Sequence, residues 1–273
     1  RNPNKNKSLK LIGDLGQVSF KCGNVNNELD VDNFIKGCDC IVNLVAVLSE
    51  SGSQNFKNLH LIAPEIISKS VLKHNVKNFI QMSTIGADIK SKSYNAQSRA
   101  LGENRVKNLV PTATIIRSSI IFGKNDAFFI RFAEMAKFSP FLPLPGGGES
   151  LYQPVYVRDV ALAIDKIIKE ISHQGKTYEL GGPTVYSWKQ LMQFINKNIK
   201  NPRFLINIPY SFLVFPAFMM SFLPSPILTV DQLRQLKTNN IVNEGMPGFQ
   251  SLDIKPSSIE VEMPKHMTLF NNS

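Results

Sequence analysis

The sequence predicts an α/β fold: a doubly wound parallel sheet, with helices on both faces, and a small α/β lobe at the carboxyl end. Long apolar runs rich in β-branched residues are typical of strands buried on both faces, and they occur at 39–50, 76–86 and 112–123. Helical patterns separate these runs, at 55–74 and in the segment that begins at Ser93. Strands and helices that alternate through short connections form parallel sheets.

The rest of the chain predicts shorter elements. A short strand is expected at 16–25 and another at 176–182. Helices are predicted at 126–138, 157–171 and 188–199, the last with Ser187 as its N-cap. A Pro/Gly-rich connector covers 139–150.

One part of a doubly wound nucleotide-binding fold is missing from this pattern. Such folds open with a strand, a Gly-rich phosphate-binding turn and a helix. The glycines at 13–16 and at 146–148 do not follow an amino-terminal strand, so we interpret them as ordinary turn glycines. We therefore expect residues 1–123 to form a truncated dinucleotide-binding domain that lacks its first strand and Gly-rich turn. Helix 157–171 is expected to pack on it, and 124–273 to form mostly the carboxyl-terminal lobe.

Composition excludes several classes of function. The chain has 273 residues, 43% of them hydrophobic, and a formal net charge of +10, which would suit nucleic acid, an anionic membrane or an acidic partner. The basic residues do not alternate with aromatic ones as in single-strand binders, so we do not expect nucleic acid as a partner. Three cysteines without a C-x-x-C pair and four dispersed histidines predict neither a disulfide framework nor a metal site.

The segment SYNAQSRALGE, at 93–103, resembles the catalytic helix of short-chain dehydrogenases but departs from it at one position. In those enzymes a Tyr lies four residues before a Lys, so that the cation can help to ionise the phenol. Here Ser98 follows Tyr94 by four residues, and Arg99 lies about 140° around the helix from Tyr94 at 3.6 residues per turn. This offset argues against hydride transfer.

Two arrangements remain open for this segment. A one-residue π-bulge between Tyr94 and Arg99 would rotate the phenol back toward the pocket. Alternatively, Tyr94 lies in the loop or first turn before the helix while Arg99 still contacts a ribose. The second arrangement would bind a nucleotide without catalysing its turnover, and we favour this arrangement.

Several longer motifs carry a resemblance to a known family. They are VNLVAVLSE, MSTIGAD, RSSIIFGKNDAFFIRFA, FLPLPGGGESLYQPVYVRDVA, TYELGGP and LTVDQLRQLKTNN. From residue 1 to about residue 263 the chain resembles the accessory subunit 9 (alpha subcomplex) family of respiratory complex I, the NADH:ubiquinone oxidoreductase, bacterial relatives included. This is an atypical, extended short-chain dehydrogenase/reductase-like family with a Rossmann fold.

The resemblance implies a mainly structural, non-catalytic subunit that stabilises or assembles complex I. It implies NADP(H), with NAD as the alternative, tightly bound in the full-length protein, and docking on subunits of the peripheral arm near the membrane. The location would be the matrix face of the mitochondrial inner membrane or the cytoplasmic face of a bacterial inner membrane. The alternative function is an NAD(P)-dependent reductase or epimerase acting on a sugar nucleotide or a similar small molecule.

The resemblance also assigns site residues by matching motifs. Arg1 would face the 2′-phosphate of NADPH, and Asn24 and Val25 would contact the adenine. Strand ends near the nicotinamide would supply Leu44, Val45, Ala46, Ser83, Arg117, Ser118, Ser119 and Ile121. Arg99 would contact the ribose. The vestigial catalytic candidates are Ser83, Thr84, Tyr94 and Arg99, and ordinary strand-end packing remains the alternative for each strand-end residue.

The segment 208–229 is the most apolar part of the chain. Four prolines interrupt it, so it is not expected to span a membrane. It would be either a buried helix of the lobe or a surface that sits on lipid or on a partner subunit. Its all-round apolarity and the family resemblance favour partial exposure to the complex or the membrane.

Overall fold

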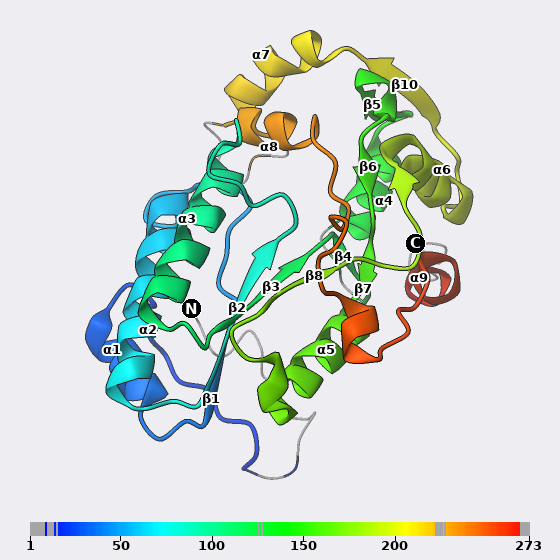
Figure 1. Cartoon of the computed structure of the whole chain (residues 1–273). Coiled ribbons are helices and arrows are strands. Elements are labelled where there is room, and N and C mark those ends of the chain that lie inside the picture. The colour runs from blue at the N-terminus through cyan, green and yellow to red at the C-terminus, as the bar shows by residue number, and fades with distance from the viewer. Residues whose placement is uncertain are drawn as a thin grey trace.

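The computed structural model describes Leu9, Asp14, residues 16–124, Asp126, residues 128–221, Pro226 and residues 228–267. Its centre is a four-stranded parallel sheet in the order β1-β2-β3-β8 (Figure 1). The strands are β1 (Cys40–Asn43), β2 (Asn78–Thr84), β3 (Thr114–Ser118) and β8 (Thr177–Leu180). Within the described part of the chain, β1 is an edge strand and no strand precedes it.

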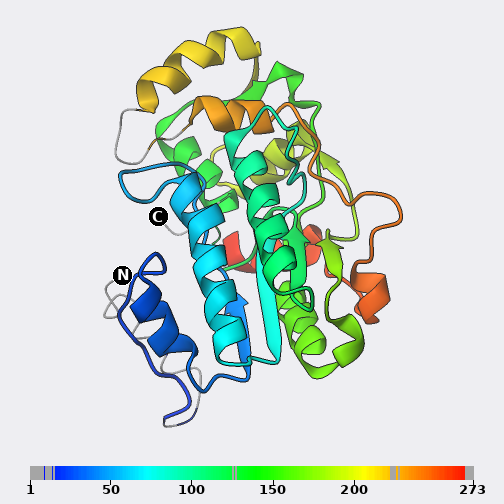
Figure 2. The same ribbon diagram turned by 60° about the vertical axis from the view of Figure 1, so that its left-hand side comes forward.

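Helices cover both faces of this sheet, as the alternation of side chains along the strands requires. On one face, Phe79 and Ile115 pack against α1 (Glu28–Ile35), α2 (Ala63–Lys73) and α3 (Tyr94–Leu109). On the other face, their neighbours Ile80 and Ile116 pack against α5 (Val157–Lys169) and the 3₁₀ turn η5 (Phe249–Leu252) (Figure 2). The doubly wound α/β prediction is confirmed.

The remaining elements form the carboxyl-terminal region. The helices are α4 (Phe129–Phe138), α6 (Trp188–Asn198), α7 (Tyr210–Met220), α8 (Val230–Gln235) and α9 (Ile259–Met267), with short 3₁₀ turns η3 (Gly146–Gly148) and η4 (Ile171–His173). Three small sheets pair β5 (Phe141–Pro145) with β10 (Phe204–Ile208), β4 (Ile121–Phe122) with β7 (Val155–Tyr156), and β6 (Leu151–Tyr152) with β9 (Tyr186–Ser187). None of the described helices has the length and apolarity needed to cross a bilayer.

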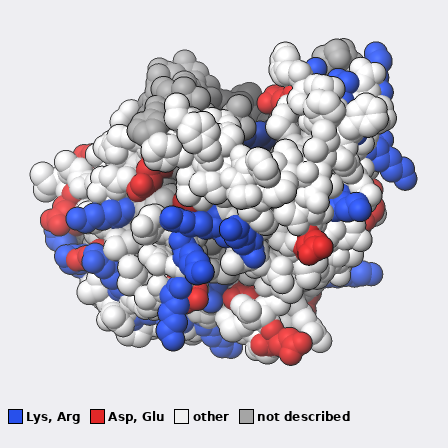
Figure 3. Space-filling view, turned by 90° about the horizontal axis from the view of Figure 1, so that it is seen from above, with Lys and Arg blue, Asp and Glu red and all other residues white. Residues whose placement is uncertain are grey.

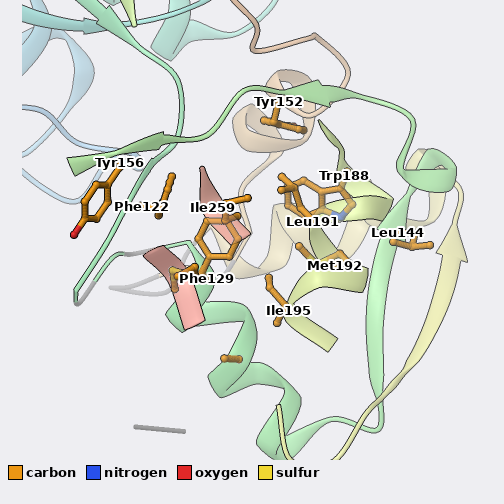
Figure 4. Packing of buried hydrophobic residues seen from close by; sticks show 12 residues of the cluster. Phe122, Phe129, Leu144, Tyr152, Tyr156, Trp188, Leu191, Met192, Ile195 and Ile259 are labelled. Atoms are coloured by element: carbon orange, nitrogen blue, oxygen red, sulfur yellow. The ribbon is translucent and has the colours of Figure 1, made fainter. Parts of the chain in front are cut away.

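An aromatic cluster holds this region together (Figure 4). Trp188, at the start of α6, meets the rings of Phe128 and Phe132 edge-on, with centroids 5.4 and 5.2 Å away. Ser187 caps α6 as predicted: its hydroxyl accepts from the Gln190 N–H, and the Gln190 side chain accepts from the Ser187 N–H. The capping box thus fixes where α6 begins and where Trp188 enters the cluster. The boundary between domains at residue 123 stays a prediction.

Two local predictions were wrong. Residues 16–25 form no strand, and they pair with no strand among the described residues. The expected connector at 139–150 contains β5, which pairs in parallel with β10. Pro143 and Pro145 are compatible with a strand here because they lie two residues apart, so both missing N–H groups fall on the same edge of a two-stranded sheet.

A π-helix precedes α2, at Lys57–Ile62, and α3 packs directly against it. Gly102 of α3 allows this approach, since a Cβ added there would lie 1.9 Å from the His60 carbonyl oxygen. A backbone oxygen cannot rotate away as a flexible side chain can. The contact therefore sets the distance between the two helices.

We predict that Gly102→Ala destabilises the protein, although alanine is the better helix former by about 1 kcal/mol. The methyl group must push the two helices apart, and we expect a net loss of about 2 kcal/mol or more in the free energy of unfolding. Urea denaturation measures this loss. Leu101→Ala, on the exposed side of the same turn, serves as the control and should cost much less. An unchanged or higher stability of Gly102→Ala would contradict the packing described here.

Candidate functional site

A small pocket opens at the carboxyl ends of β1 and β2, between the π-helix and α3. It is a shallow hollow in which only about 10 Å³ is accessible to the centre of a water molecule, and its lining comprises Val45, Leu59, His60, Gln81, Met82, Ser83, Arg99, Gly102 and Glu103. Ligands of open α/β sheets bind at this end of the strands. The location therefore makes this pocket the first candidate for a binding site.

Gln81, which lines the pocket, is paired with a second buried amide, Asn43. The Asn43 side-chain amide donates to Gln81 Oε1 at 2.8 Å, and the Gln81 amide donates to the Met82 carbonyl at 2.8 Å. The Asn43 oxygen accepts from the Val45 N–H at 3.1 Å. Because buried amides are costly when unpaired, these bonds fix both side chains and the start of the loop after β1.

Ser83 and Thr84 differ sharply in their surroundings. Ser83 is 6% exposed, and its hydroxyl has no hydrogen-bond partner among the described residues. The Thr84 hydroxyl lies 3.3 Å from each of two acceptors, the carbonyls of Ile85 and Ser118. A buried hydroxyl without a partner costs free energy, so Ser83 is the residue of this pair that a ligand could satisfy.

Arg99 enters the pocket from α3. Its Nε donates to Asn95 Oδ1 at 2.8 Å, which orients the guanidinium. Burial lowers the pKa of Arg99 to about 10, while the charge of Glu103 acts in the opposite direction. Arg99 is therefore still a cation at neutral pH, and within the described part of the chain it has no ion-pair partner.

Tyr94 lies away from this group. It is the first residue of α3, its ring is 62% exposed, and the Arg234 guanidinium lies 5.2 Å from the ring centroid. The helix is regular from Tyr94 to Leu109, so the π-bulge that would have turned the phenol inward is not present. The residue four positions on, Ser98, is buried and lies 2.9 Å from His60 Nδ1.

His60 is a site residue that the sequence analysis missed. Its Nε2 accepts from the Val47 N–H at 3.2 Å, so Nδ1 carries the proton and donates to Ser98. Burial, together with the nearby Arg99 charge, lowers the pKa of His60 to about 3. His60 is thus a neutral link between the loop after β1, the π-helix and α3. No periodic pattern marks such a residue.

Asp231 of α8 is the second residue that was missed. Its carboxylate accepts from the Tyr94 N–H at 2.7 Å, from the Asn95 N–H at 3.2 Å and from the Ser93 hydroxyl at 2.8 Å. It thereby caps α3 from a distant part of the chain. The T-x-x-Q spacing of Thr229 and Gln232 forms a capping box in the structure and could have located the start of α8.

Arg117 forms ion pairs with two buried glutamates, Glu103 and Glu179. Its Nη2 donates to Glu103 Oε2 at 2.7 Å, and its Nη1 lies 3.4 Å from Glu179 Oε1. Glu103 and Glu179 are buried, and Glu179 also accepts from the Asn243 N–H at 2.8 Å. These bonds hold α3, β3 and β8 together at this point.

The other residues assigned from the resemblance are scattered around the sheet. Ser119 donates to Asn240 Oδ1 at 2.7 Å, and the Ser118 carbonyl accepts from Ile85. Leu44 and Ala46 are exposed, Ile121 begins β4, and Asn24 and Val25 lie in the turn before α1. Arg1 lies outside the described residues. The pocket thus brings together Val45, Ser83 and Arg99, and the role of every assigned residue in binding stays a prediction. No cluster of metal-ligating side chains occurs in the described part of the chain.

Comparison with known proteins gives a consistent result. No family model matches the chain. It is 33% identical over 266 residues to NADH dehydrogenase (ubiquinone) 1 alpha subcomplex subunit 9, mitochondrial, of Arabidopsis thaliana, covering 93% of this chain and 66% of the relative. The mouse protein of the same name is 28% identical over 262 residues, with 93% of this chain and 68% of the relative covered. The chain belongs to the family of this complex I subunit.

The subunit 9 relatives are longer than this chain, which spans about two thirds of their length. Solved structures agree on the fold. The NADPH-dependent quinone oxidoreductase of Escherichia coli, complexed with NADPH, superposes with a TM-score of 0.74 at 16% identity, covering 99% of this chain and 89% of that one. The dTDP-glucose 4,6-dehydratase of Bacillus anthracis, in complex with NAD, gives a TM-score of 0.72 at 18% identity, with 98% and 84% covered.

We predict that His60 contributes a pH dependence to stability. Its pKa is lower in the folded protein than the value of about 6.5 in an unfolded chain, so its stabilisation is complete above pH 6.5 and is lost as the pH falls from there toward 3. This group alone should cost about 2 kcal/mol of unfolding free energy between pH 7.5 and pH 5. Denaturant titrations at both pH values, with and without His60→Gln, measure the difference. Equal pH dependence in the two proteins would contradict a buried neutral His60.

Proposed function

We propose that this chain is a non-catalytic, NADP(H)-holding accessory subunit of respiratory complex I, which it stabilises or helps to assemble. The observation that carries the proposal is similarity to complex I subunits from a plant and a mammal across 93% of the chain. A match of this extent includes both the sheet and the carboxyl-terminal lobe. The proposed location is the matrix face of the mitochondrial inner membrane, or the cytoplasmic face of the corresponding bacterial membrane.

The residues of the pocket fit part of a nicotinamide dinucleotide. The unpartnered Ser83 hydroxyl can donate to or accept from a ribose or carboxamide, and the Arg99 cation suits ribose or phosphate oxygens. The two solved neighbours described above contain NADPH and NAD. The choice of NADP(H) over NAD rests on the role proposed for Arg1. A Gly-rich phosphate turn following a strand is not found before β1 in the described residues.

The placement of Tyr94 favours binding without turnover. A nicotinamide nucleotide supplies a hydride, and a short-chain reductase needs a phenol close to a cation to move the accompanying proton. Tyr94 is exposed, it lies against Arg234, and it does not belong to the lining that contains Arg99. In this arrangement the pocket residues can hold a nucleotide but have no proton donor of that kind.

The apolar helix α7 is the proposed contact surface with other subunits of the peripheral arm. Phe212 is 73% exposed and Phe215 is 71% exposed, and Val214, Phe218 and Met219 are exposed as well. A helix that is apolar on all sides is typical of a buried position, so a protein partner is expected to cover it. Seen from above, this end of the molecule presents a broad uncharged area with Lys and Arg mainly at its margins (Figure 3).

We predict that NADPH raises the melting temperature of the full-length protein and that the purified protein does not consume it. A ligand that binds only the folded state stabilises it by mass action. Arg99→Met should weaken NADPH binding about tenfold or more, because it removes a half-buried cation from the pocket. Calorimetry and NADPH absorbance measure these effects, with Tyr94→Phe as the matched control that leaves both unchanged. Steady NADPH consumption that Tyr94→Phe abolishes would favour the reductase or epimerase alternative.

For the docking surface, we predict that Phe212→Ser with Phe215→Ser leaves the fold intact but prevents incorporation into complex I. Both side chains are mostly exposed, so folding should be little affected. Native electrophoresis of membranes from cells that express the variant measures incorporation. Phe138→Ser, which changes a 91% exposed phenylalanine on α4, is the control. Normal incorporation of the double variant would contradict the assignment, and binding of the isolated protein to liposomes would indicate a lipid surface instead.

A further inference from the structure

The amino-terminal end of α3 has no free hydrogen-bond donor. The N–H groups of Tyr94 and Asn95 donate to Asp231, the Ala96 N–H donates to the Ser93 hydroxyl at 3.3 Å, and the Ser93 N–H donates to the Ser91 hydroxyl at 3.1 Å. These are the four groups that a helix leaves unpaired at its start. The cap depends on α8, since Asp231 supplies the only charge that faces these donors within the hydrogen bonds of the described residues. An anionic ligand therefore cannot use this helix end.

The same carboxylate orients the cation of the pocket. Asp231 binds the Asn95 N–H, and the Asn95 side chain, which is only 2% exposed, accepts from Arg99 Nε at 2.8 Å. If the first turn of α3 moves, Asn95 moves with it and the Arg99 guanidinium loses its orientation. Asp231 thus acts on the pocket through two successive hydrogen bonds.

At its other end, α8 is attached to the apolar helix. The hydroxyl of Tyr210, the first residue of α7, donates to the Leu236 carbonyl at 2.8 Å, directly after α8. The Lys237 ammonium lies 4.9 Å from the Tyr210 ring centroid. Gly146 leaves room for this ring, because a Cβ there would come within 2.2 Å of Tyr210 Cε2. Figure 1 shows α8 between α7 and α3.

We propose that α8 couples the docking surface on α7 to the nucleotide pocket, with Asp231 as the positioning residue for Arg99. The proposal rests on the function proposed above. Covering α7 holds Tyr210 and Leu236 in place, and α8 then keeps the first turn of α3, Asn95 and Arg99 in the binding geometry. Because coupling between two binding sites is reciprocal, nucleotide in the pocket must strengthen docking through α7 by the same factor.

Amide hydrogen exchange of the full chain, read by mass spectrometry for residues 93–99, tests the connection without a ligand. Asp231→Ala should raise exchange at Tyr94 and Asn95 about tenfold or more, since both amides lose their acceptor. Tyr210→Phe should raise exchange at the same amides about threefold or more, although its hydroxyl donates to Leu236 and not to α3. Tyr186→Phe removes a comparable phenol bond, to Glu260, and should leave residues 93–99 unchanged.

Unchanged exchange at Tyr94 and Asn95 in Tyr210→Phe would overturn the coupling, and unchanged exchange in Asp231→Ala would overturn the cap itself. Calorimetry with NADPH completes the test. Tyr210→Phe should weaken NADPH binding about fivefold, within the usual range of coupling between sites. Faster exchange with unaltered NADPH affinity contradicts the link to Arg99. Failure of the unmodified protein to bind NADPH contradicts the proposed function, while the exchange experiment still decides whether α7 and α3 are connected.

Discussion

The close contact between Gly102 and the backbone of His60 is the constraint on which the arrangement of the site depends. It sets α3 against the π-helix with no side chain between them, and every polar group of the pocket is attached to one of these two helices or to the strand ends below them. Glu103 follows Gly102 directly and joins Arg117 and Glu179 in a buried ion-pair group. The same turn of α3 therefore fixes both a backbone contact and a charge contact.

Hydrogen bonds among the buried polar side chains explain why the pocket keeps one shape without a ligand. Asn43, Gln81, His60 and Ser98 are buried and hydrogen-bonded to one another or to the backbone. Breaking one bond leaves a buried group unpaired, which costs about 1 to 3 kcal/mol, so these side chains have one stable arrangement. Against this background the unpartnered Ser83 hydroxyl and the orienting bond between Asn95 and Arg99 identify the two groups that can serve a ligand.

Hydrophobic periodicity was sufficient to predict the doubly wound sheet, because a parallel strand covered on both faces leaves a continuous apolar run. The preference of helix starts for serine was sufficient to predict the cap at Ser187, whose side chain and N–H act within one turn. The prediction failed at 139–150, where prolines suggested a loop but the partner strand β10 lies about sixty residues further along the chain and its pairing could not be read locally. The strand expected at 16–25 did not form, since a strand also needs a neighbour with which to pair, and a local reading of the sequence does not show whether one is present.

The candidate site was predictable only in part. The position of Arg99 relative to Tyr94 followed from helical geometry, whereas the cap by Asp231 joins residues 137 positions apart and left no trace in any local pattern. His60 likewise gains its depressed pKa from burial and from the neighbouring Arg99, which only the folded chain brings together. Strand ends and helix spacing thus locate the pocket, while the residues that orient its groups emerge from tertiary contacts.

The central claim is that this pocket holds a nicotinamide dinucleotide without a phenol placed to use it. An experimental structure of the full-length protein with NADPH bound tests this claim most directly. We expect Arg99 and Ser83 within hydrogen-bonding distance of the nucleotide, with the Tyr94 hydroxyl out of reach of the nicotinamide ribose. A Tyr94 hydroxyl that bonds to that ribose beside the Arg99 guanidinium would contradict the account.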